Sequence, residues 1–152
     1  MKRNPYGHGD FFLLSGTGCR RDPITGRFTR HCGIDLAGIA TKQICSLSAG
    51  RVLLAGEGFP GTEGLGRCIE ILGVDQCRVL YAGLSILLVS EGDFVENGQK
   101  IGYEGMMPRE PGMHLHLEVR KNGNLLPPAD YLEIEGGPGR IRGSCVSGKN
   151  VI

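Results

Sequence analysis

The sequence has almost no net charge, no long apolar run and no CxxC motif, and each absence excludes a class of protein. Lys and Arg total 17 against 16 Asp and Glu, so bulk charge gives no argument for a nucleic-acid partner. The basic N-terminus is followed by only four apolar residues, 11–14, too few for a signal peptide or a transmembrane helix. We therefore expect a chain that leaves the cytoplasm by another route or is one module of a larger protein. The six cysteines contain no CxxC pair, which argues against a structural zinc knuckle.

Repeats, low-complexity runs and long amphipathic helical patterns are also missing, whereas glycine and proline are abundant. The 152 residues include 26 glycines and 8 prolines, which suits short strands joined by tight turns. We predict one all-β domain, a compact antiparallel sheet or sandwich with a groove, and a short helical turn at residues 127–132. The expected boundaries are an N-terminal extension over 1–11, the domain over 12–135 and a C-terminal tail over 136–152.

Alternating apolar residues and turn signals predict where the strands lie. The expected strands are 11–14, 43–47, 51–55, 67–72, 78–82, 99–103 and 113–119. Residues 15–30 and 56–66 are expected to be loops, the second of them near a binding face. Cys68 and Cys77 could face each other across a hairpin, but a one-residue shift of register would separate them. We treat all cysteines as free small hydrophobes by default.

The stretch Met113–Val119 carries the first candidate site. Its apolar residues alternate with His114, His116 and Glu118, as in a strand with one apolar and one polar face. Residues two apart point to the same side of a strand, so both imidazoles are expected side by side on an open sheet face. Such a pair suits a metal site or acid–base chemistry; the alternative is a pair of surface histidines with no task.

A third histidine and a carboxylate occur together at His31 and Asp35. In a straight strand they would lie ~13 Å apart, at about 3.3 Å per residue, but Gly33 between them permits a bend. His31, Asp35 and one histidine of the 114/116 pair would then form a two-histidine, one-carboxylate set with an open fourth position, as in catalytic zinc sites. The other histidine would act as a general base or stabilise an oxyanion. A turn-capping Asp35 and a merely packed His31 are the alternatives.

These residues belong to a series of motifs that resembles one known family. The series comprises residues 15–26, His31-x-Gly33-Ile34-Asp35, Ser48–Gly56, Leu80-Tyr81-Ala82-x-Leu84-Ser85 and His114-Leu115-His116-Leu117-Glu118-Val119. In unbroken order over residues 12–132, it resembles the lysostaphin/LytM-type zinc endopeptidases of the M23 family.

The resemblance implies both a site and a function. It implies Zn²⁺ held by His31, Asp35 and His116, with His114 as a catalytic histidine. It also implies hydrolysis of peptide cross-links in bacterial peptidoglycan, outside the cytoplasmic membrane, so the expected partner is a stem or cross-bridge peptide.

One position departs from the family pattern. Gly83 stands where the resembling Tyr-Ala-His-Leu stretch carries a second catalytic histidine. Glycine has no side chain to donate a hydrogen bond to an oxyanion, and losing one such donor costs about 10²–10³ in rate. Since the implied ligands are intact, we expect a slow zinc endopeptidase. The alternative is a catalytically degenerate domain that binds peptidoglycan or a partner protein, and a third reading is a structural β domain with incidental histidines.

Three further residues are candidates for supporting roles. Tyr81 and Arg20 are candidates for contacting substrate, since the guanidinium fork of arginine suits a stem-peptide carboxylate. The alternative for Arg20 is an ordinary solvated basic loop. Glu118 shares the strand face of the histidines, where it can orient one of them or pair across strands with a lysine or arginine.

Overall fold

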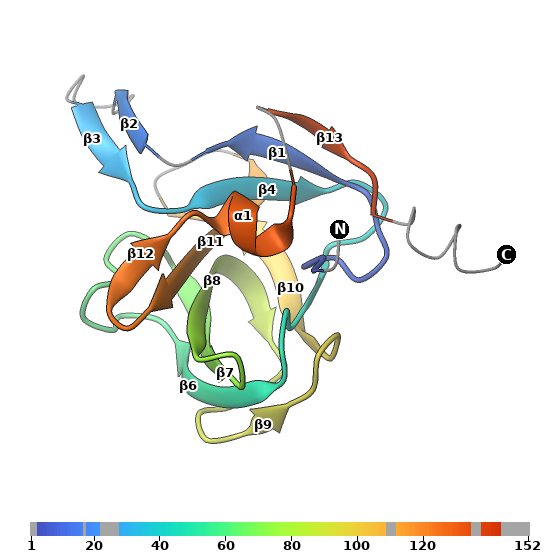
Figure 1. Ribbon diagram of the computed structural model, residues 1–152, viewed down its shortest axis with the longest axis vertical. Helices are drawn as coiled ribbons and strands as arrows, with labels where there is room; N and C mark the ends of the chain where they lie inside the picture. Colours follow the sequence, from blue (N-terminus) through green and yellow to red (C-terminus); the bar gives the residue numbers. More distant parts are fainter. Residues whose placement is uncertain (1–2, 17, 22–27, 109–111, 135–137, 144–152) are drawn as a thin grey trace, which may run out of the picture.

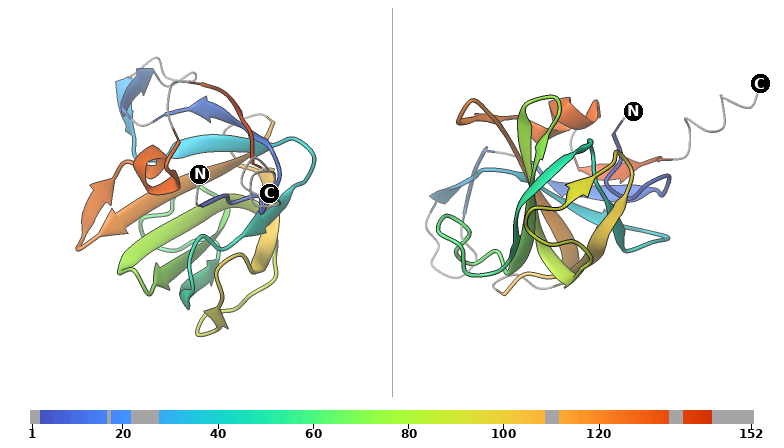
Figure 2. Two further views of the ribbon diagram at one scale, coloured as in Figure 1. Left: turned by 45° about the vertical axis from the view of Figure 1, so that its right-hand side comes forward. Right: turned by 90° about the horizontal axis from the view of Figure 1, so that it is seen from below.

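Alternating apolar side chains build a strongly curved antiparallel sheet in the computed structural model (Figures 1 and 2), which describes residues 3–16, 18–21, 28–108, 112–134 and 138–143. The strands are β1 (Phe11–Ser15), β2 (Gly18–Arg21), β3 (Phe28–His31), β4 (Ile34–Gly38), β5 (Gln43–Cys45), β6 (Gly50–Gly56), β7 (Arg67–Gly73), β8 (Cys77–Leu87), β9 (Phe94–Val95), β10 (Lys100–Met106), β11 (Met113–Lys121), β12 (Asn124–Leu126) and β13 (Gly139–Ile141). One short helix, α1 (Pro128–Leu132), follows β12.

Eleven of the described strands join one sheet, and the other two form a separate ribbon. The main sheet runs β13-β1-β4-β11-β10-β8-β7-β6-β9, with β12 beside β11 and β5 beside β10. Strand β11 also pairs directly with β8, so it lies between β4 and β8 near the middle of the sheet. Strands β2 and β3 pair only with each other and project beside β4 (Figure 1). The all-β prediction is confirmed.

The core lies on the inner face of this sheet. Strand β11 contributes Leu115, Leu117 and Val119, all with no exposed surface, because every second residue of a strand points to the same side. Strand β8 supplies Val79 and Tyr81 from the neighbouring position. Burying such side chains stabilises the fold by about 1.5–3 kcal/mol each.

Most of the predicted strands and the helical turn at 127–132 are confirmed, but the loop expected at 15–30 is wrong. Strands β2 and β3 lie within it, although its turn falls outside the described residues. Their pairing joins two short polar stretches that carry no apolar alternation, so the period-2 signal is missing there. Within the expected tail, residues 139–141 form β13 and pair with β1 at the edge of the sheet.

The pairing considered for Cys68 and Cys77 does not form. Cys68 lies opposite Ala82, whereas Cys77 begins β8 next to the turn, so the register places the two thiols at different ends of the hairpin. Both are free and buried, as are the described Cys45 and, in part, Cys32. The default expectation of free thiols is confirmed for these four.

The bend expected at Gly33 is present, and the packing shows why glycine is needed. The chain leaves β3 at His31, bends at Gly33 and enters β4 at Ile34. A Cβ at residue 33 would lie 2.2 Å from the carbonyl oxygen of Leu117 on β11. The missing side chain therefore lets the start of β4 press against β11, the strand that carries His114 and His116.

The single described helix is too short and too polar to cross a membrane.

Candidate metal centre

A carboxylate and an imidazole meet where β4 and β11 pair. Asp35 on β4 is the direct cross-strand partner of His116 on β11. The Nδ1 atom of His116 lies 3.0 Å from Oδ1 of Asp35, and both side chains are about 95% buried. Directly paired residues of an antiparallel sheet share one face, so register alone brings together two groups 81 residues apart in the chain.

A line of polar contacts holds this pair in place. The Nε2 atom of His116 donates to Oε2 of Glu118 at 2.8 Å, and Arg120 donates to the other oxygen of Glu118 at 2.6 Å. On the far side, the hydroxyl of Ser15 on β1 donates to Oδ2 of Asp35 at 2.9 Å. Of the two roles considered for Glu118, the contact with a histidine is present, whereas its arginine partner, Arg120, lies on the same strand and not across from it. Ser15 carries no sequence signal for this role, because only the pairing of β1 with β4 places it opposite Asp35.

The two carboxylates determine the protonation of His116. Burial by itself would lower the pKa of His116, but the hydrogen bonds and charges of Asp35 and Glu118 outweigh burial and raise this pKa to about 9. Burial would likewise raise the pKa of Glu118, yet the contacts with His116 and Arg120 hold it below its ordinary value. At neutral pH and without a metal, the two carboxylates therefore favour the protonated ring of His116, which donates both ring hydrogens to them.

His114 lies on the same face of β11, two residues before His116. Its Nδ1 donates to the carbonyl oxygen of Gly112 at 3.3 Å, so the residue just before β11 orients the ring. The prediction that both histidines share a face is confirmed, but the prediction of an open face is wrong. His114 and His116 are each only 4% exposed and Glu118 only 8%. The polar face of β11 is therefore covered in the folded chain, which the alternation within that strand cannot reveal.

For His31, the implied third ligand, and Arg20, a predicted substrate contact, the structure describes the backbone but not the side chain. His31 ends β3 and its backbone pairs with Gly18, two residues before the bend at Gly33, while Arg20 pairs with Thr29. The side chains of His31 and Arg20 lie outside the described part of the structure. Among the side chains that are described, no three of His, Cys, Asp or Glu gather around one point that could hold a metal ion.

Zinc nevertheless fits the donor atoms that are described. Zinc binds imidazole nitrogen and carboxylate oxygen at about 2.0–2.2 Å, so two tetrahedral ligand atoms lie ~3.4 Å apart. The 3.0 Å between Asp35 and His116 is close to this separation. Replacing the hydrogen on Nδ1 with a metal would leave the Nε2 hydrogen bond to Glu118 intact, and zinc-bound histidines usually donate such a bond to a carboxylate.

The backbone conformation and the packing at residue 83 both favour glycine. It is the bulged residue of β8, with φ at +81°, a left-handed conformation that favours glycine. A Cβ there would lie 2.9 Å from Cγ of Met107 and 3.1 Å from the carbonyl oxygen of His114. The buried Met107 thus occupies the space beside His114 that a side chain at residue 83 would enter. The sequence gives no signal for this contact.

Tyr81 is not brought to the metal centre. It is completely buried in the core on the opposite face of β8 from Ala82, and its hydroxyl accepts a hydrogen bond from the backbone N–H of Leu47 at 2.9 Å. Burial raises its pKa well above the ordinary range. These contacts make Tyr81 part of the core, on the face of β8 opposite the metal centre.

The fold and the site define an antiparallel β domain with a buried carboxylate–imidazole pair beside a second histidine. Comparison with known families then gives a plain assignment: the chain belongs to peptidase family M23, whose sequence model matches residues 29–128. The resemblance seen in the motifs is confirmed.

Curated relatives are longer proteins. DD-carboxypeptidase/endopeptidase Mpg of Neisseria meningitidis is 32% identical over 116 residues, which cover 76% of this chain and 26% of Mpg. Peptidoglycan DD-endopeptidase ShyB of Vibrio cholerae is 35% identical over 100 residues, covering 66% of this chain and 22% of ShyB. The chain thus spans about a quarter of the length of these relatives.

Solved structures share the fold. The catalytic domain of lysostaphin, an antimicrobial peptidase from Staphylococcus simulans, matches with a TM-score of 0.66 and 28% identity over 78% of this chain and 89% of that one. A zinc-containing peptidase from Vibrio cholerae matches with a TM-score of 0.63 and 26% identity over 82% of this chain and 39% of that one. The SpoIIQ–SpoIIIAH pore-forming complex matches with a TM-score of 0.70 over 86% of this chain and 89% of that one; at 23% identity it shows the fold alone.

Proposed function

We propose that this chain is a zinc-dependent endopeptidase that cleaves peptide cross-links of bacterial peptidoglycan, working outside the cytoplasmic membrane. The observation that carries the proposal is the buried Asp35–His116 pair at 3.0 Å, with His114 on the same strand face. The family assignment supports it, as do relatives named as peptidoglycan endopeptidases and as a zinc-containing peptidase.

Three residues would hold the metal: Asp35, His116 and, from the family resemblance, His31. A zinc ion bound there supplies the Lewis acidity that hydrolysis of a peptide bond needs. Glu118 keeps the ring of His116 in one orientation, and Arg120 holds Glu118 in turn. Because Asp35 and His116 are almost fully buried, water has little access to their contact, which strengthens electrostatic interactions at the site.

His114 is the proposed catalytic imidazole. The bond from its Nδ1 to the Gly112 carbonyl oxygen fixes the hydrogen there in the neutral ring, so Nε2 carries the lone pair that a general base uses. Gly83 removes the second imidazole that the family pattern supplies. We therefore expect a rate about 10²–10³ below that of a site with both histidines, which corresponds to ~2.7–4 kcal/mol.

A second candidate function is a binding or scaffold domain that no longer hydrolyses peptides. The observation that favours it is the fit of Met107 against Gly83, because the position of the second histidine is closed by packing and by backbone conformation. The SpoIIQ–SpoIIIAH complex offers a precedent for this fold in a protein assembly.

The deciding experiment is release of soluble peptides from purified peptidoglycan by the zinc-loaded protein. Wild type is compared with Asp35→Ala, which removes a proposed ligand, and with Asp130→Ala, an exposed carboxylate on α1, as the matched control. Release by wild type and Asp130→Ala but not by Asp35→Ala supports the peptidase. No release by wild type, together with retention of the protein on peptidoglycan, would favour the scaffold.

A further inference from the structure

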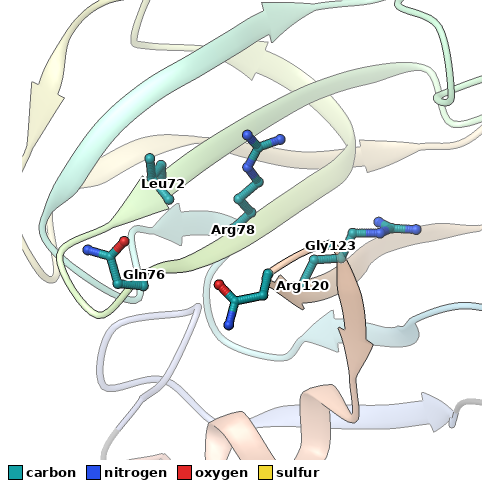
Figure 3. A pocket seen from close by; sticks show the side chains of 6 residues that line it. Leu72, Gln76, Arg78, Arg120 and Gly123 are labelled. Carbon is teal, nitrogen blue, oxygen red and sulfur yellow. The ribbon is translucent and has the colours of Figure 1, made fainter.

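A cavity of about 390 Å³ opens at the end of the sheet where two hairpins turn side by side. One turn joins β7 to β8, and the other joins β11 to β12. The cavity is lined by Leu72, Gln76, Arg78, Arg120, Asn122 and Gly123. Figure 3 shows the side chains of Arg78 and Arg120 leaving neighbouring strands in different directions, with Gln76 at the β7–β8 turn.

This cavity lies on the same sheet face as the metal centre but separate from it. Counting along β11, the cross-strand pairs on this face are His116 with Ala82, Glu118 with Leu80, and Arg120 with Arg78. At about 3.3 Å per residue, Arg120 lies ~13 Å along the strand from His116. Phe59 and Leu65 pack over the intervening strip at Leu80 and Ala82. The cavity is therefore separate from the metal centre on this face and lies next to the β7–β8 and β11–β12 turns.

The charges in the cavity are unbalanced. Arg78 and Arg120 are direct cross-strand partners, and like charges in that arrangement repel each other. Glu118 neutralises Arg120 through a contact of 2.6 Å with one nitrogen of the guanidinium group. The other N–H donors of Arg120 can bind another acceptor. The guanidinium group of Arg78 has no ion pair or hydrogen bond within the described part of the chain, and none of the residues that line the cavity is a carboxylate. An anion bound by Arg78 in this cavity would offset the repulsion between the two cationic residues.

The remaining lining residues suit a peptide that carries this anion. Gln76 and Asn122 present amide groups, which can both donate to and accept from peptide bonds. Both residues sit in tight turns with positive φ, at +70° and +53°, so the turns hold their backbones in defined positions. Leu72 supplies an apolar contact next to Arg78.

We propose that the Arg78–Arg120 cavity is an accessory binding site for a carboxylate of a peptidoglycan peptide. Arginine forks bind carboxylates with two parallel hydrogen bonds, and strands position the forks more firmly than loops would. The cavity would hold a second point of the wall while the metal centre engages a peptide bond. The inference rests on the proposed peptidoglycan substrate and does not require hydrolysis.

Calorimetric binding of one peptide pair to the full chain tests the proposal. The probes are a synthetic stem pentapeptide with free carboxylates and the same peptide with every carboxylate amidated, measured with and without zinc. Arg78→Gln removes one guanidinium group. The matched control, Lys121→Gln, removes one charge from the residue after Arg120, which points to the other side of β11. Circular dichroism checks that both variants are folded.

We expect wild type and Lys121→Gln to bind the acid about tenfold more tightly than the amide, the scale of one charge-assisted hydrogen bond. Arg78→Gln should bring this ratio close to one, and Arg78→Lys should fall between. Equal binding of acid and amide by wild type, or no binding of either, would overturn the proposal. Inorganic phosphate binding as tightly as the acid would also overturn it, because the cavity would then be a general anion site.

The peptide-release assay separates this inference from the proposed function. If wild type releases peptides but binds acid and amide equally, the proposed peptidase is supported and the accessory site is refuted. A protein that shows the Arg78-dependent preference without releasing peptides would keep the accessory site and lose the peptidase.

Discussion

Replacing Gly83 with alanine should lower the free energy of unfolding by more than the left-handed backbone conformation of residue 83 alone would cost. Two costs act at this position. A left-handed φ costs a residue with a Cβ about 1–2 kcal/mol, and crowding a packed region adds about 1–3 kcal/mol. The crowding follows from the distances of 2.9 Å to Met107 and 3.1 Å to the His114 carbonyl oxygen. We therefore expect Gly83→Ala to lower the free energy of unfolding by about 2–5 kcal/mol.

Gly98 provides a matched control. Its φ of +84° nearly equals the +81° of Gly83, but a Cβ there would meet no atom within 4 Å. Gly98→Ala should therefore cost only the backbone part, about 1–2 kcal/mol. The entropy that alanine removes from the unfolded chain is the same in both variants and cancels in the comparison.

Urea unfolding followed by far-UV circular dichroism is a suitable assay, because the chain has no tryptophan. For a domain of this size, each kcal/mol also shifts Tm by about 2–4 °C. If Gly83→Ala costs no more than Gly98→Ala, the packing of Met107 against residue 83 is refuted. If neither variant is destabilised, the argument from φ fails as well. The same reasoning predicts that Gly83→His is destabilised too, so adding the imidazole alone will not rebuild a two-histidine site.

Two further predictions concern the metal and the tyrosines. Zinc at 100 times its dissociation constant should stabilise wild type by about 2.7 kcal/mol, and it should stabilise Asp35→Ala and His116→Ala much less. Equal shifts in Tm on adding zinc to all three proteins would contradict the proposed ligands. Burial raises the pKa values of Tyr6, Tyr81 and Tyr131 in the folded chain. In the unfolded chain all four tyrosines titrate near 10. At about pH 11 the folded chain should therefore show clearly less tyrosinate absorbance than the unfolded chain. Because folding favours the neutral phenols, stability should be fully present below about pH 10 and fall as the pH rises further; a full tyrosinate signal with a native circular dichroism spectrum would contradict this.

Local patterns were sufficient for much of the secondary structure. The alternation from Met113 to Val119 predicts β11, and it also predicts that His114, His116 and Glu118 share a face. The two prolines at 127 and 128 predict the short helix. These predictions succeed because the side-chain period of a strand and the capping of a helix depend on residues adjacent in the chain.

Which side chains meet could not be predicted in this way. Tyr81 looked like a residue of the site, yet the register of β8 turns it into the core. Gly83 looked like a simple loss of a histidine, yet the bulge in β8 and the position of Met107 give it a further role. A shift of one residue in register moves every side chain of a strand to the other face, and no local signal fixes that register.

By itself, the sequence determined that this is a β-rich domain, with ordered motifs that resemble M23 peptidases and a face of β11 that carries two histidines. Only the tertiary structure decided that Asp35 meets His116, that this polar face is buried, and that Arg78 lies opposite Arg120. The physical reason is that each of these facts is a pairing between strands far apart in the chain. Such pairings are fixed by the packing of the whole sheet, for example by the close approach of Gly33 to Leu117 on β11.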